Sequence, residues 1–362
     1  MNFTIEQRLG AEQIFTLSYV GALGRRLIGT LVFPPADGNP AVFAQINPIT
    51  GAVTPDSLII LGNFSSSSYH SLQTKFQRQF SRGLAAVASY TWSHSIDDTS
   101  VNSQVATVTL PTAATISTGL PVTLLRADSD FDVRQNLALS MVYNIPSPSN
   151  RLARAILGHW SFDPIYHYQT ALPIDILTGI AGSIGSSTYN QRPNLIPGVP
   201  VYVYGTACAA LNGGQGCPGG MQLNTAPVTA AEAASAGCLA PTATNAKGAF
   251  CTPLTVGGQA VSGDLGRNAV RAYPLQELDL SLQRDFPFTE RIRLRVQADM
   301  FNVVNHPSFG PENSTLNNPA FGTSTNMANS SLGANISGGA GFNPVFSTGG
   351  PRNFQLALKL FF

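Results

Sequence analysis

Charged residues with regular spacing are the first candidates for chemistry in this sequence. Asp128, Asp130 and Asp132 alternate along the chain, and alternate side chains of an extended segment share one face. Three carboxylates on one side could bind Ca²⁺, but no following glycine and glutamate complete a calcium-binding loop. The favoured interpretation is therefore that these three acids are solvated groups at the outer mouth of a strand.

A second charged set lies on one parity of two segments with strand-like alternation, residues 275–284 and 291–302. Its members are Glu277, Asp279, Arg293, Arg295 and Asp299. If these segments cross a membrane within a barrel, this parity faces the aqueous lumen, because the other parity is apolar and faces lipid. The set could contact a solute or a plug. The favoured alternative is that its acids and arginines neutralise one another as lumen ion pairs.

The four cysteines, Cys208, Cys217, Cys238 and Cys251, all lie in one long segment between predicted strands. Their spacings of nine, twenty-one and thirteen residues match no CxxC metal motif. In an extracytoplasmic compartment, two disulfides are expected. Local spacing favours Cys208 with Cys217 and Cys238 with Cys251, although two other pairings and a zinc site remain alternatives.

Motifs of enzyme active sites are missing from this sequence. There is no GxSxG, HExxH or Walker phosphate-binding loop, and the five histidines are dispersed. Residues 214–219 match GxGxxG, but they follow no strand and lie between cysteines, so a flexible loop is the favoured interpretation. We therefore expect neither enzymatic activity nor a cofactor.

Alternation of apolar and polar residues predicts the elements that carry these groups. Nine segments alternate with a period of two: residues 2–9, 13–21, 69–80, 84–95, 135–144, 160–169, 275–284, 291–302 and 352–362. Short connections alternate with irregular stretches at residues 22–68, 96–131, 170–273 and 303–351. Residues 151–157, in one short connection, suffice for one or two helical turns. In an up-and-down sheet, all the long loops then lie at one end.

The last predicted strand has one fully apolar face. The residues on that face are Phe354, Leu356, Leu358, Leu360 and Phe362, and those on the other face are Asn353, Gln355, Ala357 and Lys359. An outer-membrane barrel presents lipid to such a face and water or protein to the opposite one. We expect this strand to be the closing strand of a barrel and the membrane-insertion signal that the barrel-assembly machinery recognises.

Composition supports a membrane barrel over a soluble β-sandwich or β-propeller. The chain of 362 residues is 11% charged, whereas soluble proteins carry about 25%. The net charge of +1 gives no sign of the excess positive charge that nucleic-acid-binding proteins carry. There is no apolar run of 18 residues and no signal-peptide pattern. The prediction is an all-β, antiparallel up-and-down transmembrane β-barrel in the cell outer membrane of a Gram-negative bacterium, with long extracellular loops and outer-membrane lipid as its surroundings.

The number of predicted strands suggests that the barrel is partial. Nine is odd, whereas single-chain bacterial barrels usually have even counts. Either a strand lies unrecognised in a long loop, with residues 201–204 as the candidate, or an N-terminal part of the barrel is outside this chain. The expectation is that the chain supplies about nine or ten strands of a larger barrel.

Four segments carry a resemblance to TonB-dependent outer-membrane receptors of the Oar-like group. They are residues 69–98, 129–134, 158–170 and 297–306, and they follow the family order along nearly the whole chain. The resemblance implies that residues 1–362 are the C-terminal portion of a barrel of about 22 strands, with the plug and N-terminal domains absent from this sequence. It also implies binding or uptake of a bulky solute, driven by an inner-membrane energy-coupling complex that acts through the plug. The alternatives are a surface adhesion or assembly protein with a barrel anchor, and a passive porin.

Overall fold

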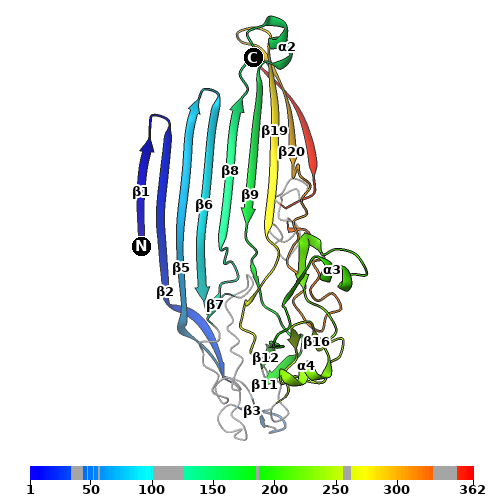
Figure 1. Ribbon diagram of the computed structural model, residues 1–362. Helices are drawn as coiled ribbons and strands as arrows, with labels where there is room; N and C mark the ends of the chain where they lie inside the picture. The colour runs from blue at the N-terminus through cyan, green and yellow to red at the C-terminus, as the bar shows by residue number, and fades with distance from the viewer. Residues whose placement is uncertain are drawn as a thin grey trace.

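In a computed structural model of the chain, nine long strands form one antiparallel sheet (Figure 1). The structure describes residues 1–33, 44–46, 48–51, 53–55, 58–98, 100, 126–184, 187–255, 262–328 and 349–362. Sequence neighbours pair in space, in the order β1-β2-β5-β6-β8-β9-β19-β20-β21. Within the described residues, β1 and β21 each have one neighbour, so the sheet is open, as expected of part of a larger up-and-down barrel.

Each strand of this sheet contains one of the predicted segments or most of it, and β2 and β5 extend well beyond theirs. The nine strands are β1 (Asn2–Leu9), β2 (Gln13–Phe33), β5 (Leu58–Ser81), β6 (Leu84–Asp97), β8 (Gln135–Asn144), β9 (Trp160–Gln169), β19 (Leu275–Pro287), β20 (Arg293–Phe301) and β21 (Asn353–Phe361). The two-residue strand β7 (Ala127–Asp128) pairs with the end of β6. All nine predicted strands are therefore present.

Registry between strands places the apolar parities on one continuous face. Leu356 lies opposite Ala298, which lies opposite Leu282, and Leu282 lies opposite Phe162. Because side chains alternate along each strand, a sheet in this register has one apolar face and one polar face. We call these the apolar face and the polar face.

The prediction that residues 22–68 are irregular is wrong. Strand β2 continues to Phe33 and pairs with β5 from Leu58 onward, with register shifts around Leu27. The apolar alternation is interrupted at Gly24, Arg25 and Arg26, and Arg26 has a positive φ of 56°. Continued backbone pairing between the two strands needs no apolar alternation, so hydrophobic periodicity did not reveal this extension.

Short connections lie at one end of the sheet and long loops at the other (Figure 1). The connection between β8 and β9 contains the predicted helix, α2 (Arg151–Leu157), and Asn150 is its N-cap residue. The Asn150 side chain accepts hydrogen bonds from the backbone N–H groups of Leu152 and Ala153, as an N-cap residue does. No helix in the described part of the chain is long and apolar enough to cross a membrane.

The long loops contain secondary structure of their own, so the predicted irregularity of residues 170–273 is also wrong. Small strand pairs are β10 (Pro173–Ile174) with β18 (Val270–Arg271), β11 (Ala181–Ile184) with β12 (Ser187–Asn190), and β14 (Tyr202–Tyr204) with β15 (Met221–Leu223); β17 (Phe250–Cys251) pairs with both β13 (Asn194–Leu195) and β16 (Ala246–Lys247). The helices are α3 (Thr206–Leu211), η2 (Pro218–Gly220) and α4 (Ala230–Ser235). Another small hairpin, β3 (Ala44–Ile46) with β4 (Val53–Pro55), lies in the loop after β2.

A buried hydrophobic core joins residues 170–274 to residues 303–328. Ile176, Leu223, Phe250, Leu316 and Phe321 are at most 2% exposed and belong to one cluster. We call the described parts of these two segments the loop domain. It contains β14, at the position where an extra barrel strand was considered, but β14 pairs with β15 and not with the large sheet. Long loops without a periodic pattern here fold around their own core.

Candidate functional site

Seven charged side chains meet where the loop domain contacts the ends of the long strands. Four are acids, Asp97, Asp128, Asp130 and Asp132, and three are arginines, Arg134, Arg267 and Arg271. The acids and Arg134 come from β6, β7 and the approach to β8, whereas Arg267 and Arg271 come from the loop domain. We call this group the ion-pair network.

Arg267 is the most buried arginine of the network. Its Nη2 donates to the Asp97 carboxylate at 2.6 Å and to the Asp97 carbonyl at 2.8 Å. Its Nη1 donates to the Ser100 carbonyl at 2.6 Å and lies 3.4 Å from Asp130. The guanidinium thus satisfies several groups at the end of β6 with charge-assisted hydrogen bonds, which are stronger than neutral ones.

Arg271 and Arg134 share the other two acids. Arg271 donates from Nη2 to both Asp128 and Asp132. Arg134 forms ion pairs with the same two carboxylates at 2.9 and 2.8 Å. Burial alone would raise the pKa of Asp128, but hydrogen bonds from His94, Arg134 and Arg271 outweigh it and hold the pKa below its usual value. Asp128 is therefore a carboxylate at neutral pH.

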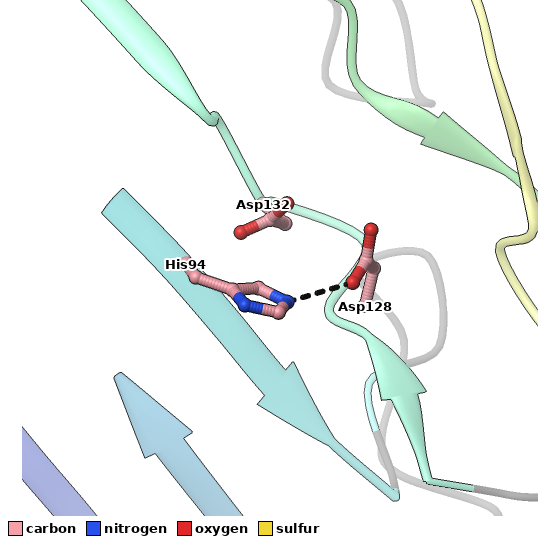
Figure 2. A group of neighbouring side chains, drawn as sticks. All are labelled: His94, Asp128 and Asp132. Carbon is pink, nitrogen blue, oxygen red and sulfur yellow. Dashed lines mark hydrogen bonds and ion pairs between the residues drawn. The ribbon is translucent and has the colours of Figure 1, made fainter. Parts of the chain in front are cut away.

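Three members of this region have the geometry of a metal site, as Figure 2 shows. One ligand atom each of His94, Asp128 and Asp132 lies within 4.8 Å of the others, and His94 Nε2 is 2.9 Å from Asp128 Oδ1. However, both carboxylates already bind the two guanidinium groups of Arg134 and Arg271. The arginines supply the positive charge that a metal ion would supply, so the arrangement favours a structural ion-pair network.

The favoured interpretation of Asp128, Asp130 and Asp132 as solvated acids is wrong. Asp132 is 1% exposed, and all three carboxylates have arginine partners. Their partners Arg267 and Arg271 lie more than 130 residues further along the chain. Only the folding of the loop domain brings these groups together, and no local sequence pattern predicts their contacts.

An open pocket of about 650 Å³ lies beside the ion-pair network. The side chains of Asp128, Tyr168, Tyr202, Arg267 and Arg271 are among those that line it. It therefore combines aromatic rings with fixed charged and polar groups, as binding sites for polar solutes do.

One tyrosine of the pocket is held in place by a backbone strand. The Tyr202 hydroxyl accepts a hydrogen bond from the Arg271 N–H at 2.7 Å and donates one to the Arg271 carbonyl at 2.9 Å. Burial raises the pKa of Tyr202 above its usual value. The ring is thus a neutral and rigid part of the pocket wall.

The predicted lumen set is on the polar face, but its expected ion pairs are not formed. Arg295 instead makes a two-point contact with Asp285, at 2.7 and 3.0 Å, and Arg293 lies 3.7 Å from the same carboxylate. Asp285 lies directly opposite Arg295 in the β19–β20 register. The sequence prediction ended this strand at residue 284 and so missed Asp285, which has the same parity as Glu277 and Asp279.

The three predicted acids of the lumen set have other partners. Asp279 accepts the backbone N–H of Asn302 at 2.8 Å, and Asp299 accepts the side-chain amide of Gln297. Glu277 is 6% exposed and accepts a backbone N–H from the last loop. No ion pair joins these acids to Arg293 or Arg295 in the part of the chain that the structure describes. A solute-contacting role for the set remains a prediction.

The cysteines form two disulfides within the loop domain. Cys208 is bonded to Cys217 and Cys238 to Cys251, which is the pairing that local spacing favours. No thiol remains free to bind zinc. Cys238 and Cys251 belong to a second buried cluster with Ile196, so this disulfide links packed segments of the loop domain.

The terminal strand presents its apolar side chains as the alternation predicts. Phe354, Leu356, Leu358 and Leu360 are between 58% and 80% exposed in the isolated chain. On the polar face, the Phe361 ring lies against Arg293 at 4.4 Å and Arg295 at 5.5 Å. Recognition of this strand as an insertion signal remains a prediction.

A one-sided apolar, up-and-down antiparallel sheet with long loops at one end defines the class of outer-membrane β-barrel proteins. The chain belongs to the family described as the outer membrane beta barrel domain, whose model matches residues 1–343. Its location is therefore the cell outer membrane. The apolar face of the sheet is the lipid-facing face, and the polar face lines the interior.

Among solved structures, the chain is similar to the outer membrane transporter YddB from Escherichia coli. The two share 9% sequence identity with a TM-score of 0.42, over 99% of this chain and 31% of that transporter. The chain thus spans less than one third of the length of that protein. A search of curated proteins finds no match.

Proposed function

We propose that this chain is the barrel portion of a TonB-dependent transporter of the Oar-like group, and that its loop domain captures a bulky solute outside the cell. The pocket between the loop domain and the strand ends carries the proposal. A loop domain with its own core and two disulfides holds this pocket in a fixed shape. A preformed pocket with aromatic and charged walls supports selective capture more than unselective diffusion.

The proposed energy source rests on the resemblance of residues 69–98, 129–134, 158–170 and 297–306 to the Oar-like group. In this proposal, an inner-membrane energy-coupling complex acts through a plug domain that belongs to the whole protein. The barrel-assembly machinery inserts the barrel, and no enzymatic step is involved. The polar face, including Asp285 and Arg295, lines the route that the solute takes.

A pocket-filling variant tests this function with little effect on the ion-pair network. Met221 lines the pocket, and Met221→Trp would occupy its volume. Cells carrying the full-length protein are incubated with defined sets of fluorescent oligosaccharides and peptides. We expect accumulation that a protonophore abolishes and that Met221→Trp reduces at least tenfold. Leu254→Trp, at an exposed position of the loop domain outside the pocket lining, is the control and should not change accumulation.

The same assay separates the alternatives. Accumulation that persists with the protonophore, together with steady conductance in planar bilayers, would indicate a porin. No accumulation of any probe, together with loss of cell attachment when the gene is deleted, would indicate an adhesion protein. Either result would overturn the proposed transport function.

A further inference from the structure

Helix α2, at the short-turn end of the sheet, has an apolar side that the protein does not cover. None of its residues is buried. Leu152, Ile156 and Leu157 are 79%, 68% and 58% exposed. Because helical residues four apart lie on the same face, Leu152 and Ile156 are neighbours on one side. Arg151, three residues before Arg154, lies elsewhere on the helix surface and is exposed as well.

A helix of this length needs a partner. Isolated helices shorter than about 12–15 residues are marginal in water, and α2 has seven residues. Its Asn150 cap satisfies backbone donors at the first turn, but its large apolar side chains are each more than half exposed. The segment therefore has a formed amphipathic surface whose apolar part is mostly uncovered by protein.

Two side chains of the lipid-facing wall hold the last turn of α2. The Trp160 indole Nε1 donates to the Ile156 carbonyl at 3.1 Å, and Arg284 donates to the Ala155 carbonyl. Trp160 and Arg284 are direct cross-strand partners in the β9–β19 register. Both have the parity of Phe162 and Leu282, which are on the lipid-facing face. The end of α2 is therefore attached to the outer wall of the barrel and not to its interior.

Arg284 occupies an aromatic setting typical of a membrane interface. Its guanidinium lies 5.3 Å from the Trp160 ring centre and 4.4 Å from that of Phe286. Aromatic residues of barrel proteins gather where the hydrocarbon meets the head groups, and arginine side chains extend from the apolar region toward polar partners. This cluster marks the level of the inner, periplasmic edge of the hydrocarbon, and α2 begins from that level.

We infer that α2 lies in the inner leaflet of the outer membrane as an interfacial anchor. Leu152, Ile156 and Leu157 enter the acyl-chain boundary, and Arg151 faces phospholipid phosphates. The lipid-facing wall continues directly into α2 through Trp160 and Arg284, so the occupant of the helix surface is the lipid that already covers the wall. A segment with exposed Leu and Ile, basic residues and no acid has the composition of interfacial helices. The inference does not depend on the transport function.

Depth measurements on the reconstituted protein test this inference. The four cysteines of this chain are all in disulfides, so a cysteine introduced here accepts a nitroxide label once any free cysteine elsewhere in the full-length protein is replaced by serine. The full-length protein is labelled at Ile156→Cys or, as the matched control, at Arg151→Cys. It is reconstituted at a high lipid ratio in vesicles of phosphatidylethanolamine and phosphatidylglycerol. We expect the label at 156 to collide with oxygen at least threefold more than with a water-soluble nickel complex, and the label at 151 to show the opposite preference.

Equal exposure of both labels to the nickel complex would overturn the inference. The vesicles contain no other protein, and shielding by another part of the same protein would lower collisions with both oxygen and the nickel complex. Frequent oxygen collisions together with rare nickel collisions at 156 therefore indicate lipid. If α2 instead binds a periplasmic protein partner, both labels would be equally exposed to the nickel complex in these vesicles. In a second variant, Leu152→Asp combined with a label at 157 should raise nickel accessibility at 157 if lipid holds the helix. The heat-dependent gel mobility of folded barrels confirms that each variant is folded before measurement.

Discussion

Arg267 reaches back 170 residues along the chain to hydrogen-bond Asp97, with 2.6 Å between its Nη2 and the Asp97 carboxylate. Both side chains are almost fully buried, at 7% and 6% exposure. Asp97 ends strand β6, whereas Arg267 belongs to the loop domain. This pair therefore fixes the loop domain to the transmembrane sheet and, with it, the wall of the pocket.

Replacing Arg267 by methionine should detach the loop domain from the end of β6. Removing one partner of a buried ion pair leaves an uncompensated charge, which costs about 3–5 kcal/mol. Hydrogen exchange of the loop-domain amides measures this loss, and we expect exchange to accelerate there while the long strands remain protected. In the double variant Asp97→Asn with Arg267→Met, the buried charge is gone, so part of the protection should return. Unchanged exchange in the single variant would show that the pair does not hold the domain.

The disulfide between Cys238 and Cys251 should stabilise the loop domain without affecting the sheet. It closes a loop over a separation of 13 residues, for which chain entropy predicts about 3 kcal/mol. Both sulfur-bearing residues pack in the second buried cluster. We expect Cys238→Ala with Cys251→Ala to make the loop domain sensitive to trypsin. Heat-dependent gel mobility should be retained, because the barrel strands contain no cysteine.

A buried acid gives the loop domain a pH dependence. Glu312 is 4% exposed, and neither of its carboxylate oxygens has a hydrogen-bond partner from another described residue. Burial raises its pKa from 4.5 to about 7. Since the folded-state pKa is raised, the group contributes its full stability below pH 4.5, and this contribution is lost as pH rises through 7. The total change is about 3 kcal/mol.

Urea unfolding of the loop domain between pH 4.5 and 8 measures this dependence, with loop-domain tryptic sensitivity as the signal. In wild type, we expect the stability to fall toward pH 8. Glu312→Gln cannot ionise, so its stability should fall less than that of wild type over the same range and exceed that of wild type at pH 8. Parallel pH curves for the two proteins would exclude Glu312 as the responsible group.

The transmembrane part of this fold could be predicted from the sequence because lipid imposes a simple rule. One face of each strand must be apolar, so a period of two marks both the strand and its orientation. Leu356 lies on the face that this rule predicts for it, opposite Ala298. The same rule did not reveal the extension of β2 to Phe33, where backbone pairing persists without apolar alternation.

The candidate site could not be predicted because its members are brought together by tertiary folding. Arg271 donates a hydrogen bond to Asp132, which lies 139 residues away in the sequence. The local sequence around either residue does not predict this partner. Asp285 was within reach of sequence reasoning. A tight turn at residues 288–292 sets the register that places it opposite Arg295, but the strand was predicted to end at residue 284, three residues before its last residue, Pro287.

A pair of lysine substitutions on adjacent residues of β21 tests the assignment of the two faces. Leu356 is 80% exposed in the isolated chain and lies opposite Ala298 on the lipid-facing face. Its neighbour Gln355 lies opposite Asp299 on the polar face. A lysine near the bilayer midplane on the lipid-facing side of a barrel costs about 2–4 kcal/mol, because its charge must leave water. On the polar face, Lys359 already donates to Gln297 at 2.9 Å, so lysine is compatible with that side.

We therefore expect Leu356→Lys to destabilise the folded protein in lipid vesicles by about 2–4 kcal/mol. Gln355→Lys should change this stability by less than about 1 kcal/mol, since it stays in a polar environment and lies opposite an acid. Reversible guanidinium titration of the full-length protein in vesicles provides both values. The two positions are adjacent in sequence and close in depth, so the difference between them reports the face and not the level in the membrane. Equal costs, or a larger cost at Gln355, would mean that the sheet faces the membrane in some other way than its apolar parity indicates.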